Sequence, residues 1–146
     1  MLRNIRTRSD ESIVEEIKFL YRTYGYQGFM FYDDELNVNP KMVVLMQKLA
    51  KAGKELGVEW KLRGFIKSER FTDEQAQAMF EAGFRQILIG FESGSPRILE
   101  NIQKLATLED NTRCMTIANR HGLKVKALMS LGHPGESEET NAQTRD

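Results

Sequence analysis

The sequence predicts an α/β fold in which a parallel sheet is built from about four strand–helix units. Short apolar runs alternate along the chain with amphipathic stretches of helical length. Glycines able to end helices recur at Gly25, Gly57, Gly83 and Gly122, at the spacing of one strand–helix unit. Helices between consecutive strands favour parallel pairing through right-handed crossovers. Four strands are too few for a complete (β/α)8 barrel, so the pattern is typical of part of a parallel barrel or of a doubly wound sheet.

Capping residues set the helix boundaries. Ser9 is predicted to cap the first helix, and Thr72 opens a capping box at the third. Asn39 and Pro40 are predicted to begin the second helix. The predicted helices run from about Asp10 to Tyr24, from Asn39 to Gly57, from Thr72 to Gly83, briefly from Pro96, and from about Leu108 to His121.

The predicted strands are Phe29–Tyr32, Val58–Leu62, Gln86–Phe91 and Leu123–Leu131. The third is a near-continuous apolar run, typical of a strand covered on both faces, and it stops abruptly at Glu92 and Ser93. Ligands of parallel α/β proteins bind where strands end and helices begin. Glu92 is therefore predicted to be functional rather than only structural.

Charged or small residues follow every predicted strand. They are Asp33, Asp34 and Glu35 after the first strand, Arg63 after the second, Glu92 and Ser93 after the third, and Gly132–Glu136 after the fourth. In a parallel sheet these groups converge on one edge. Carboxylates with one guanidinium suit a ligand that carries both an ammonium and a carboxylate, and glycines let the backbone approach a flat ring. The edge thus predicts a ligand made of an amino acid and a nucleoside.

Each of these groups also has a structural interpretation. Asp33 and Glu35 can cap turns, Arg63 can form a surface ion pair, and the glycines at 132 and 135 can serve turn geometry alone. His133 is interpreted as a loop residue rather than a base. No catalytic residue is assigned within the chain.

Composition excludes several classes. The 146 residues suit one domain, and 21 basic side chains balance 21 acidic ones, so neither a nucleic-acid partner nor a membrane surface is indicated. The segment Met1–Asp10 is polar, which predicts no signal peptide. One cysteine excludes an internal disulfide and an intrachain multi-cysteine metal site, and fits a reducing cytoplasm. That residue, Cys114, is interpreted as a small buried hydrophobe.

Longer stretches bear a specific resemblance. The order of FYDDELNVNP, WKLRGF, EAGFRQILIGFESGSPRILENIQK and HGLKVKALMSLGHPGESEET resembles the radical S-adenosylmethionine (SAM) enzymes, from Arg6 to Thr140. The likeness is nearest to the branch that often carries a cobalamin-binding domain. It implies a partial (β/α) TIM-type barrel that holds SAM and a [4Fe–4S] cluster. Reductive cleavage of SAM would give a 5′-deoxyadenosyl radical for a substrate-modifying reaction.

The resemblance also implies roles for individual residues. By position, Asp33 and Asp34 face the methionine end of SAM, Arg63 faces the same pocket, Glu92 and Ser93 contact the ribose or the amino group, and the backbone of Leu131, Gly132, Pro134 and Gly135 lies against adenine.

The chain departs from the family at the cluster. The CxxxCxxC motif and the strand that precedes it are missing, as is the last strand. A cluster with one open iron needs three thiolates, which one cysteine cannot supply. Residues 1–146 are therefore interpreted as the central part of a radical SAM core domain, inactive alone, with the cluster and possibly cobalamin held by absent segments.

Two other hypotheses stay open. The chain could be a cluster-free remnant or partner module that binds SAM or a nucleoside without catalysis. It could instead be part of an unrelated barrel such as an aldolase, which would need a lysine at a strand end, where neither Lys61 nor Lys126 is well placed. In every case, unpaired sheet edges predict self-association.

Overall fold

The computed structural model describes residues 7–145 and shows one parallel four-stranded sheet in the order β1-β2-β3-β4. The strands are β1 (Gly28–Phe31), β2 (Lys61–Phe65), β3 (Phe84–Glu92) and β4 (Lys124–Met129). All three neighbouring pairs are parallel, which confirms the predicted α/β class. Within the described residues, β1 and β4 are the edge strands.

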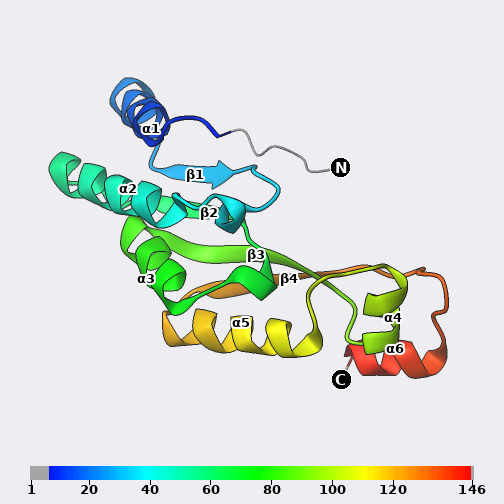
Figure 1. Cartoon of the computed structure of the whole chain (residues 1–146). Coiled ribbons are helices and arrows are strands. Elements are labelled where there is room, and N and C mark those ends of the chain that lie inside the picture. The colour runs from blue at the N-terminus through cyan, green and yellow to red at the C-terminus, as the bar shows by residue number, and fades with distance from the viewer. Residues whose placement is uncertain (1–6, 146) are drawn as a thin grey trace.

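Helices connect the strands, and several of them cover one face of the sheet (Figure 1). They are α1 (Asp10–Tyr24), α2 (Met42–Leu56), α3 (Asp73–Ala82), α4 (Pro96–Asn101), α5 (Leu108–Arg120) and α6 (Glu138–Arg145), with short 3-10 turns at η1 (Leu36–Val38) and η2 (Ser68–Arg70). The bounds of α1 are those predicted, because Ser9 Oγ accepts a hydrogen bond from Ser12 N–H and Gly25 takes a left-handed φ of 73°. The predicted capping box of Thr72 and Gln75 is also confirmed.

The core lies between the sheet and the helices α1, α2, α3 and α5. Leu62, Ile87 and Ile89 point from the strands into this core, where they meet apolar side chains of all four helices. Trp60 lies just before β2 and donates its indole N–H to the Leu49 carbonyl at 3.0 Å. This bond satisfies the one polar group of a side chain that is only 3% exposed. The core is therefore complete on the helical side of the sheet.

The second strand begins later than predicted, which relocates Arg63. Val58, Trp60 and Leu62 alternate as in a strand, but Trp60 is a core residue ahead of β2, which runs from Lys61 to Phe65. Arg63 thus lies inside the strand and not at its end. Gly64 continues the strand, and its lack of a side chain leaves room for Leu36, since a Cβ there would come within 2.7 Å of Leu36 Cδ1.

The second helix also begins later than predicted, at Met42. Asn39 does not cap it; its side-chain oxygen accepts a hydrogen bond from Lys41 N–H at 2.9 Å in the turn before the helix. This local turn displaces the expected start by a few residues.

Two short helices lie beyond the carboxyl ends of the strands. Figure 1 shows α4 and α6 next to each other at that end of the molecule. Gly94, in the turn between β3 and α4, allows this arrangement, because a Cβ at Gly94 would lie 2.4 Å from the Gln143 carbonyl oxygen of α6. The GFESGS stretch is thereby fixed to the last helix.

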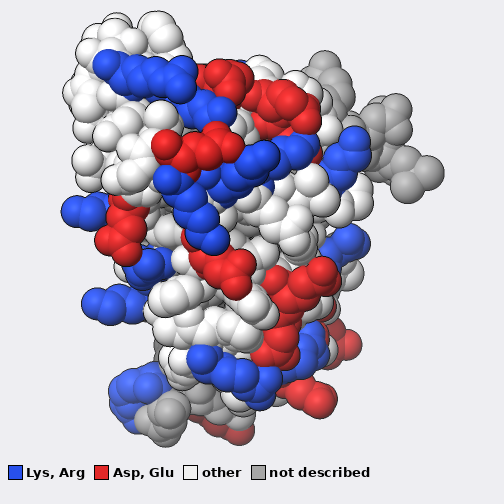
Figure 2. Space-filling view, turned by 90° about the vertical axis from the view of Figure 1, so that its left-hand side faces the viewer, with Lys and Arg blue, Asp and Glu red and all other residues white. Residues whose placement is uncertain are grey.

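Surface charges are mixed in sign. Figure 2 shows basic and acidic side chains interspersed on the side of the molecule that lies at the left of Figure 1. Lys48 of α2, for example, pairs with Asp10 at 3.0 Å and with Glu11 at 2.6 Å. Between residues 7 and 145, each helix is too short or too polar to cross a bilayer.

Candidate functional site

A hollow of about 450 Å³ opens at the carboxyl ends of the strands. We call it the carboxyl-end hollow; its lining includes Asp34 after β1, Phe65 of β2, Glu92 of β3, Lys104 after α4 and Leu128 of β4. All four strands, or the loops that follow them, thus contribute to one cavity. This is the position at which parallel α/β proteins bind ligands.

Glu92 takes an unusual backbone conformation at the end of β3. Its φ is 65°, in the left-handed region, and the Ser93 N–H donates to the Phe91 carbonyl at 2.8 Å, which closes a γ-turn around it. The register between β3 and β4 shifts at the same point, between Gly90 and Glu92. Such strain in a non-glycine residue costs about 1–3 kcal/mol and is typical of functional sites.

Two side chains contact the carboxylate of Glu92, and a third contacts one of these two. Ser130 Oγ donates to Glu92 Oε2 at 2.8 Å, and Lys104 Nζ lies 3.4 Å from Glu92 Oε1. His133 Nε2 lies 2.6 Å from the same Ser130 Oγ. Ser130 Oγ carries one proton, which it donates to Glu92, so its oxygen accepts from His133 Nε2. The carboxylate is therefore fixed in one orientation.

Gly90 leaves the space that this orientation requires. A Cβ at Gly90 would lie 2.4 Å from Glu92 Oε1 and 3.4 Å from Lys104 Nζ. An added Cβ would therefore displace the Glu92 carboxylate, whereas Lys104 Nζ would be at an ordinary contact distance. In the sequence IGFE, Gly90 therefore leaves room for the carboxylate, and Glu92 occupies the strained turn.

Ser93 lies outside the carboxyl-end hollow. It is buried, its hydroxyl lies 3.0 Å from Thr144 Oγ1 of α6, and it accepts a hydrogen bond from Ser95 N–H at 3.1 Å. Ser95 occupies the N-cap position of α4, but its side chain makes no capping hydrogen bond. These contacts give Ser93 a structural environment rather than an exposed one.

The loop after β4 is organised by Glu136. Its carboxylate accepts hydrogen bonds from Gly132 N–H at 2.9 Å and from His133 N–H at 3.0 Å. These backbone donors hold the pKa of Glu136 below its ordinary value. The Pro134 and Gly135 carbonyls accept from Asn101 and Arg97 of α4. Leu131 is 75% exposed at the start of this loop.

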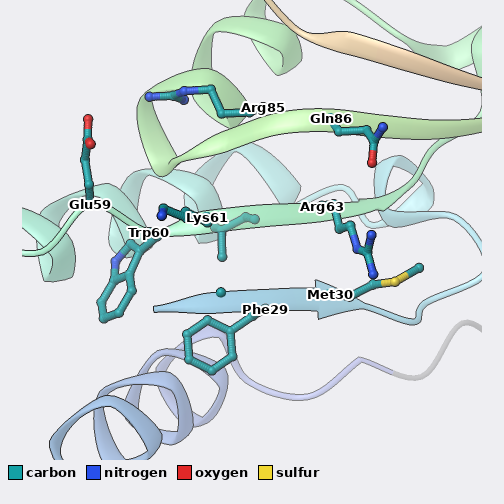
Figure 3. A pocket seen from close by; sticks show the side chains of 10 residues that line it. Phe29, Met30, Glu59, Trp60, Lys61, Arg63, Arg85 and Gln86 are labelled. Atoms are coloured by element: carbon teal, nitrogen blue, oxygen red, sulfur yellow. The ribbon is translucent and has the colours of Figure 1, made fainter. Parts of the chain in front are cut away.

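The structure brings together only part of the predicted site. Asp34 and Glu92 line the same hollow, whereas Asp33 lines a separate pocket against α1. Arg63 lines a third pocket, of about 660 Å³, near the amino ends of the strands. In Figure 3 its side chain extends from β2 toward Met30 of β1. The structure therefore does not bring Arg63 into the hollow that Asp34 and Glu92 line.

Two residues of the site were not predicted. Lys104 lies three residues after Asn101, the last residue of α4, and no local pattern marks it. Ser130 is the first residue after β4 and directly precedes the glycine-rich loop. Its position at a strand end could have identified it, because that is where the other candidates were sought.

The donors and acceptors present suit SAM but not an iron–sulfur cluster. Carboxylates such as Glu92 and Asp34 can accept hydrogen bonds from ribose hydroxyls or an ammonium. Cys114 lies buried within α5, and burial raises the pKa of its thiol to about 12. Among residues 7–145 there is no group of three or more cysteine, histidine or carboxylate side chains that could hold a metal. Cluster ligands are not found in this part of the chain.

Comparison with known proteins places these features in a family. A family model described as "Radical SAM superfamily" matches residues 1–146. An uncharacterised methyltransferase of Pyrococcus horikoshii is 30% identical over 135 residues, which cover 92% of this chain and 28% of that protein. The anaerobic magnesium-protoporphyrin IX monomethyl ester cyclase of Rubrivivax gelatinosus is 26% identical over 144 residues, which cover 97% of this chain and 25% of the cyclase.

Solved structures share the fold. The radical SAM methyltransferase TsrM from Kitasatospora setae, with cobalamin and a [4Fe–4S] cluster bound, superposes with a TM-score of 0.85 at 21% identity, covering 94% of this chain and 28% of TsrM. The cobalamin-dependent radical SAM enzyme OxsB superposes with a TM-score of 0.78 at 16% identity, covering 98% and 22%. The chain thus spans about a quarter of the length of the relatives it matches.

Proposed function

Because this chain belongs to the radical SAM superfamily, we propose that it supplies the SAM-binding edge of a larger radical SAM enzyme. The observation that carries the proposal is the strained Glu92 at the end of β3, whose carboxylate faces a hollow of about 450 Å³. Backbone strain of this kind persists only where the surrounding structure fixes the conformation, and it is concentrated at catalytic and ligand-binding sites.

The residues around the hollow have distinct roles in this proposal. Glu92 accepts hydrogen bonds from the ribose hydroxyls or the amino group of SAM, and Asp34 accepts from the methionine end. Lys104 and Ser130 orient the Glu92 carboxylate. The loop from Leu131 to Gly135 forms the side of the site next to adenine.

Other parts of the enzyme complete the chemistry. We infer that SAM is the source of a 5′-deoxyadenosyl radical, with the electron supplied by a [4Fe–4S] cluster whose ligands lie outside this chain. Several relatives are named as methyltransferases; among the similar structures, TsrM holds bound cobalamin and OxsB is a cobalamin-dependent enzyme. These names support methyl transfer as the reaction class and cobalamin as a second cofactor in a flanking domain.

Calorimetric titration with SAM tests the proposal. The protein, with its native flanking sequence, is compared with Glu92→Gln and with Glu100→Gln, a control on the exposed face of α4. Loss of a charged hydrogen-bond partner should weaken binding by about 1–3 kcal/mol in Glu92→Gln and leave the control unchanged. Equal affinities in all three proteins would make Glu92 structural and remove the basis of the proposal.

A further inference from the structure

Four basic side chains project from the sheet on the face opposite the helices. Lys61 and Arg63 come from β2, and Lys124 and Lys126 come from β4. Side chains alternate along a strand. The intervening Leu62 of β2 lies in the helical core and Val125 of β4 packs against it, so these four point the other way. With Gln86 of β3 between them, we call this group the basic face.

Strand register places these side chains in neighbouring rows. Arg63 pairs with Gln86, and Gln86 pairs with Lys124, so the three lie side by side across β2, β3 and β4. Two strand spacings separate Arg63 from Lys124, about 10 Å. Lys126 lies one row nearer the carboxyl ends. The donors thus form neighbouring rows on one face of the sheet, which suits a molecule with more than one anionic group.

The basic face has no compensating charge on the described strands. The positions of β1 to β4 on this side carry no carboxylate before Glu92. Within residues 7–145, the four cations form no ion pair and no side-chain hydrogen bond, and all four are exposed. Figure 3 shows the neighbouring acid, Glu59, extending away from Arg63. An uncompensated basic surface of this kind attracts anions.

A cavity accompanies the charge. Lys61, Arg63 and Gln86 line the pocket of about 660 Å³ beside β1 and β2. In Figure 3 the Gln86 amide points from β3 toward β2. The Arg63 side chain extends from β2 toward Met30 of β1. A guanidinium can grip one carboxylate or phosphate with two parallel hydrogen bonds, while an amide and a lysine add single donors.

The basic face and the carboxyl-end hollow share the same side of β3. Gln86 precedes Glu92 by six residues along the strand, about 20 Å. Phe65, Gly90 and Leu128 lie between the two and line the hollow. A substrate lying along the sheet could therefore reach the cofactor at one end and the cations at the other.

From this juxtaposition we propose that the basic face binds the anionic oxygen groups, carboxylate or phosphate, of the enzyme's substrate. The inference rests on the proposed function, because it names the substrate class of the same site. Arg63 is the main anchor, since it combines charge with two-point geometry, and Lys124 and Lys126 hold a second anionic group.

Calorimetry at low ionic strength tests the inference, with pyrophosphate and glutarate as the phosphate and dicarboxylate probes. The double variant Arg63→Gln, Lys126→Gln is compared with Arg22→Gln, Lys54→Gln, which removes the same charge from exposed positions of α1 and α2. We expect saturable binding of at least one probe to the wild type, weakened by at least about tenfold in the first variant and within about twofold of wild type in the second. SAM is titrated against all three proteins in parallel.

The outcomes separate this inference from the proposed function. Wild-type binding of SAM without saturable binding of either probe would overturn the basic face alone, as would equal loss in both double variants. The first double variant could also be less thermally stable while the wild type binds neither probe. That result would assign the cations to contacts within the complete enzyme and would overturn the proposal that they bind substrate. Probe binding without SAM binding would support the basic face and contradict the proposed function.

Discussion

Glu92 and Ser130 are joined by two hydrogen bonds that link the ends of β3 and β4. Ser130 Oγ donates to the Glu92 carboxylate at 2.8 Å, and Ser130 N–H donates to the Glu92 carbonyl at 3.0 Å. One residue therefore holds both the backbone and the side chain of the strained glutamate. The ends of these strands form one rigid unit, and several expectations depend on it.

Glycine at position 92 should be more stable than alanine. Both Glu92→Ala and Glu92→Gly lose the bonds to Ser130 and Lys104, but only glycine adopts a φ of 65° without steric cost. We expect the free energy of unfolding of Glu92→Gly to exceed that of Glu92→Ala by about 1 kcal/mol, measured by urea denaturation. Equal stabilities would show that the turn relaxes when the carboxylate is removed.

Alanine at position 90 should impair binding more than folding. The added Cβ would meet the end of the Glu92 side chain, which can move at little cost to the fold. We expect Gly90→Ala to change the free energy of unfolding by less than about 1 kcal/mol and to weaken SAM binding in the same titration as Glu92→Gln. Unchanged SAM affinity would mean that the orientation of Glu92 is not needed.

Alanine at position 94 should instead impair folding. A Cβ there would meet the backbone of α6 at Gln143 and Thr144, which cannot move without displacing the helix. We expect Gly94→Ala to lower the free energy of unfolding by about 1–3 kcal/mol. Gly28→Ala is the matched control, because its added Cβ would have only ordinary contacts, at 3.7 Å or more. Similar stability of the two variants would contradict the close approach of α6.

Glu136 should titrate below its ordinary pKa of 4.5, because the backbone N–H groups of His133 and Gly132 stabilise its charged form. Since the folded-state pKa is the lower one, this stabilisation is present above 4.5 and is lost as pH falls through the folded-state pKa. Carbon-13 NMR of the side-chain carboxyl carbon measures the midpoint, with Glu136→Gln to assign the signal. A midpoint at or above 4.5 would contradict the loop geometry.

Cys114 should take no part in cluster binding. It is buried in α5 with a pKa of about 12, so almost none of it is thiolate near neutral pH. Cys114→Ala should leave the iron content of the reconstituted enzyme unchanged, as measured by a colorimetric iron assay. Native Cys114 should also resist iodoacetamide until the protein unfolds. Loss of iron in the variant would assign a ligand that the structure does not indicate.

The sequence predicts the boundaries of helices and strands best where a local capping signal marks them. Ser9 and Gly25 delimit α1 correctly because a cap and a left-handed glycine each act within one turn of helix. The second strand was misplaced because Trp60 fits the alternation of a strand although tertiary packing puts it in the core. Gly64 lies beyond the predicted end of the second strand, whereas in the structure it continues β2 and leaves room for Leu36, which is distant in sequence.

The candidate site was predicted only in part for the same reason. Position at a strand end identified Asp34 and Glu92, which do line the carboxyl-end hollow. The left-handed φ of Glu92 is not visible in the sequence, because such positions favour glycine. Lys104 and Ser130 reach Glu92 only through the packing of α4 and β4. Contacts between segments far apart in the chain therefore decide the details of the site.

A structure of the complete protein with SAM bound tests the central claim most directly. We predict that SAM occupies the carboxyl-end hollow, with the Glu92 carboxylate within hydrogen-bond distance of a ribose hydroxyl or the amino group, and with Glu92 still held by Ser130. SAM bound elsewhere, with Glu92 making only its contacts to Ser130 and Lys104, would contradict the account.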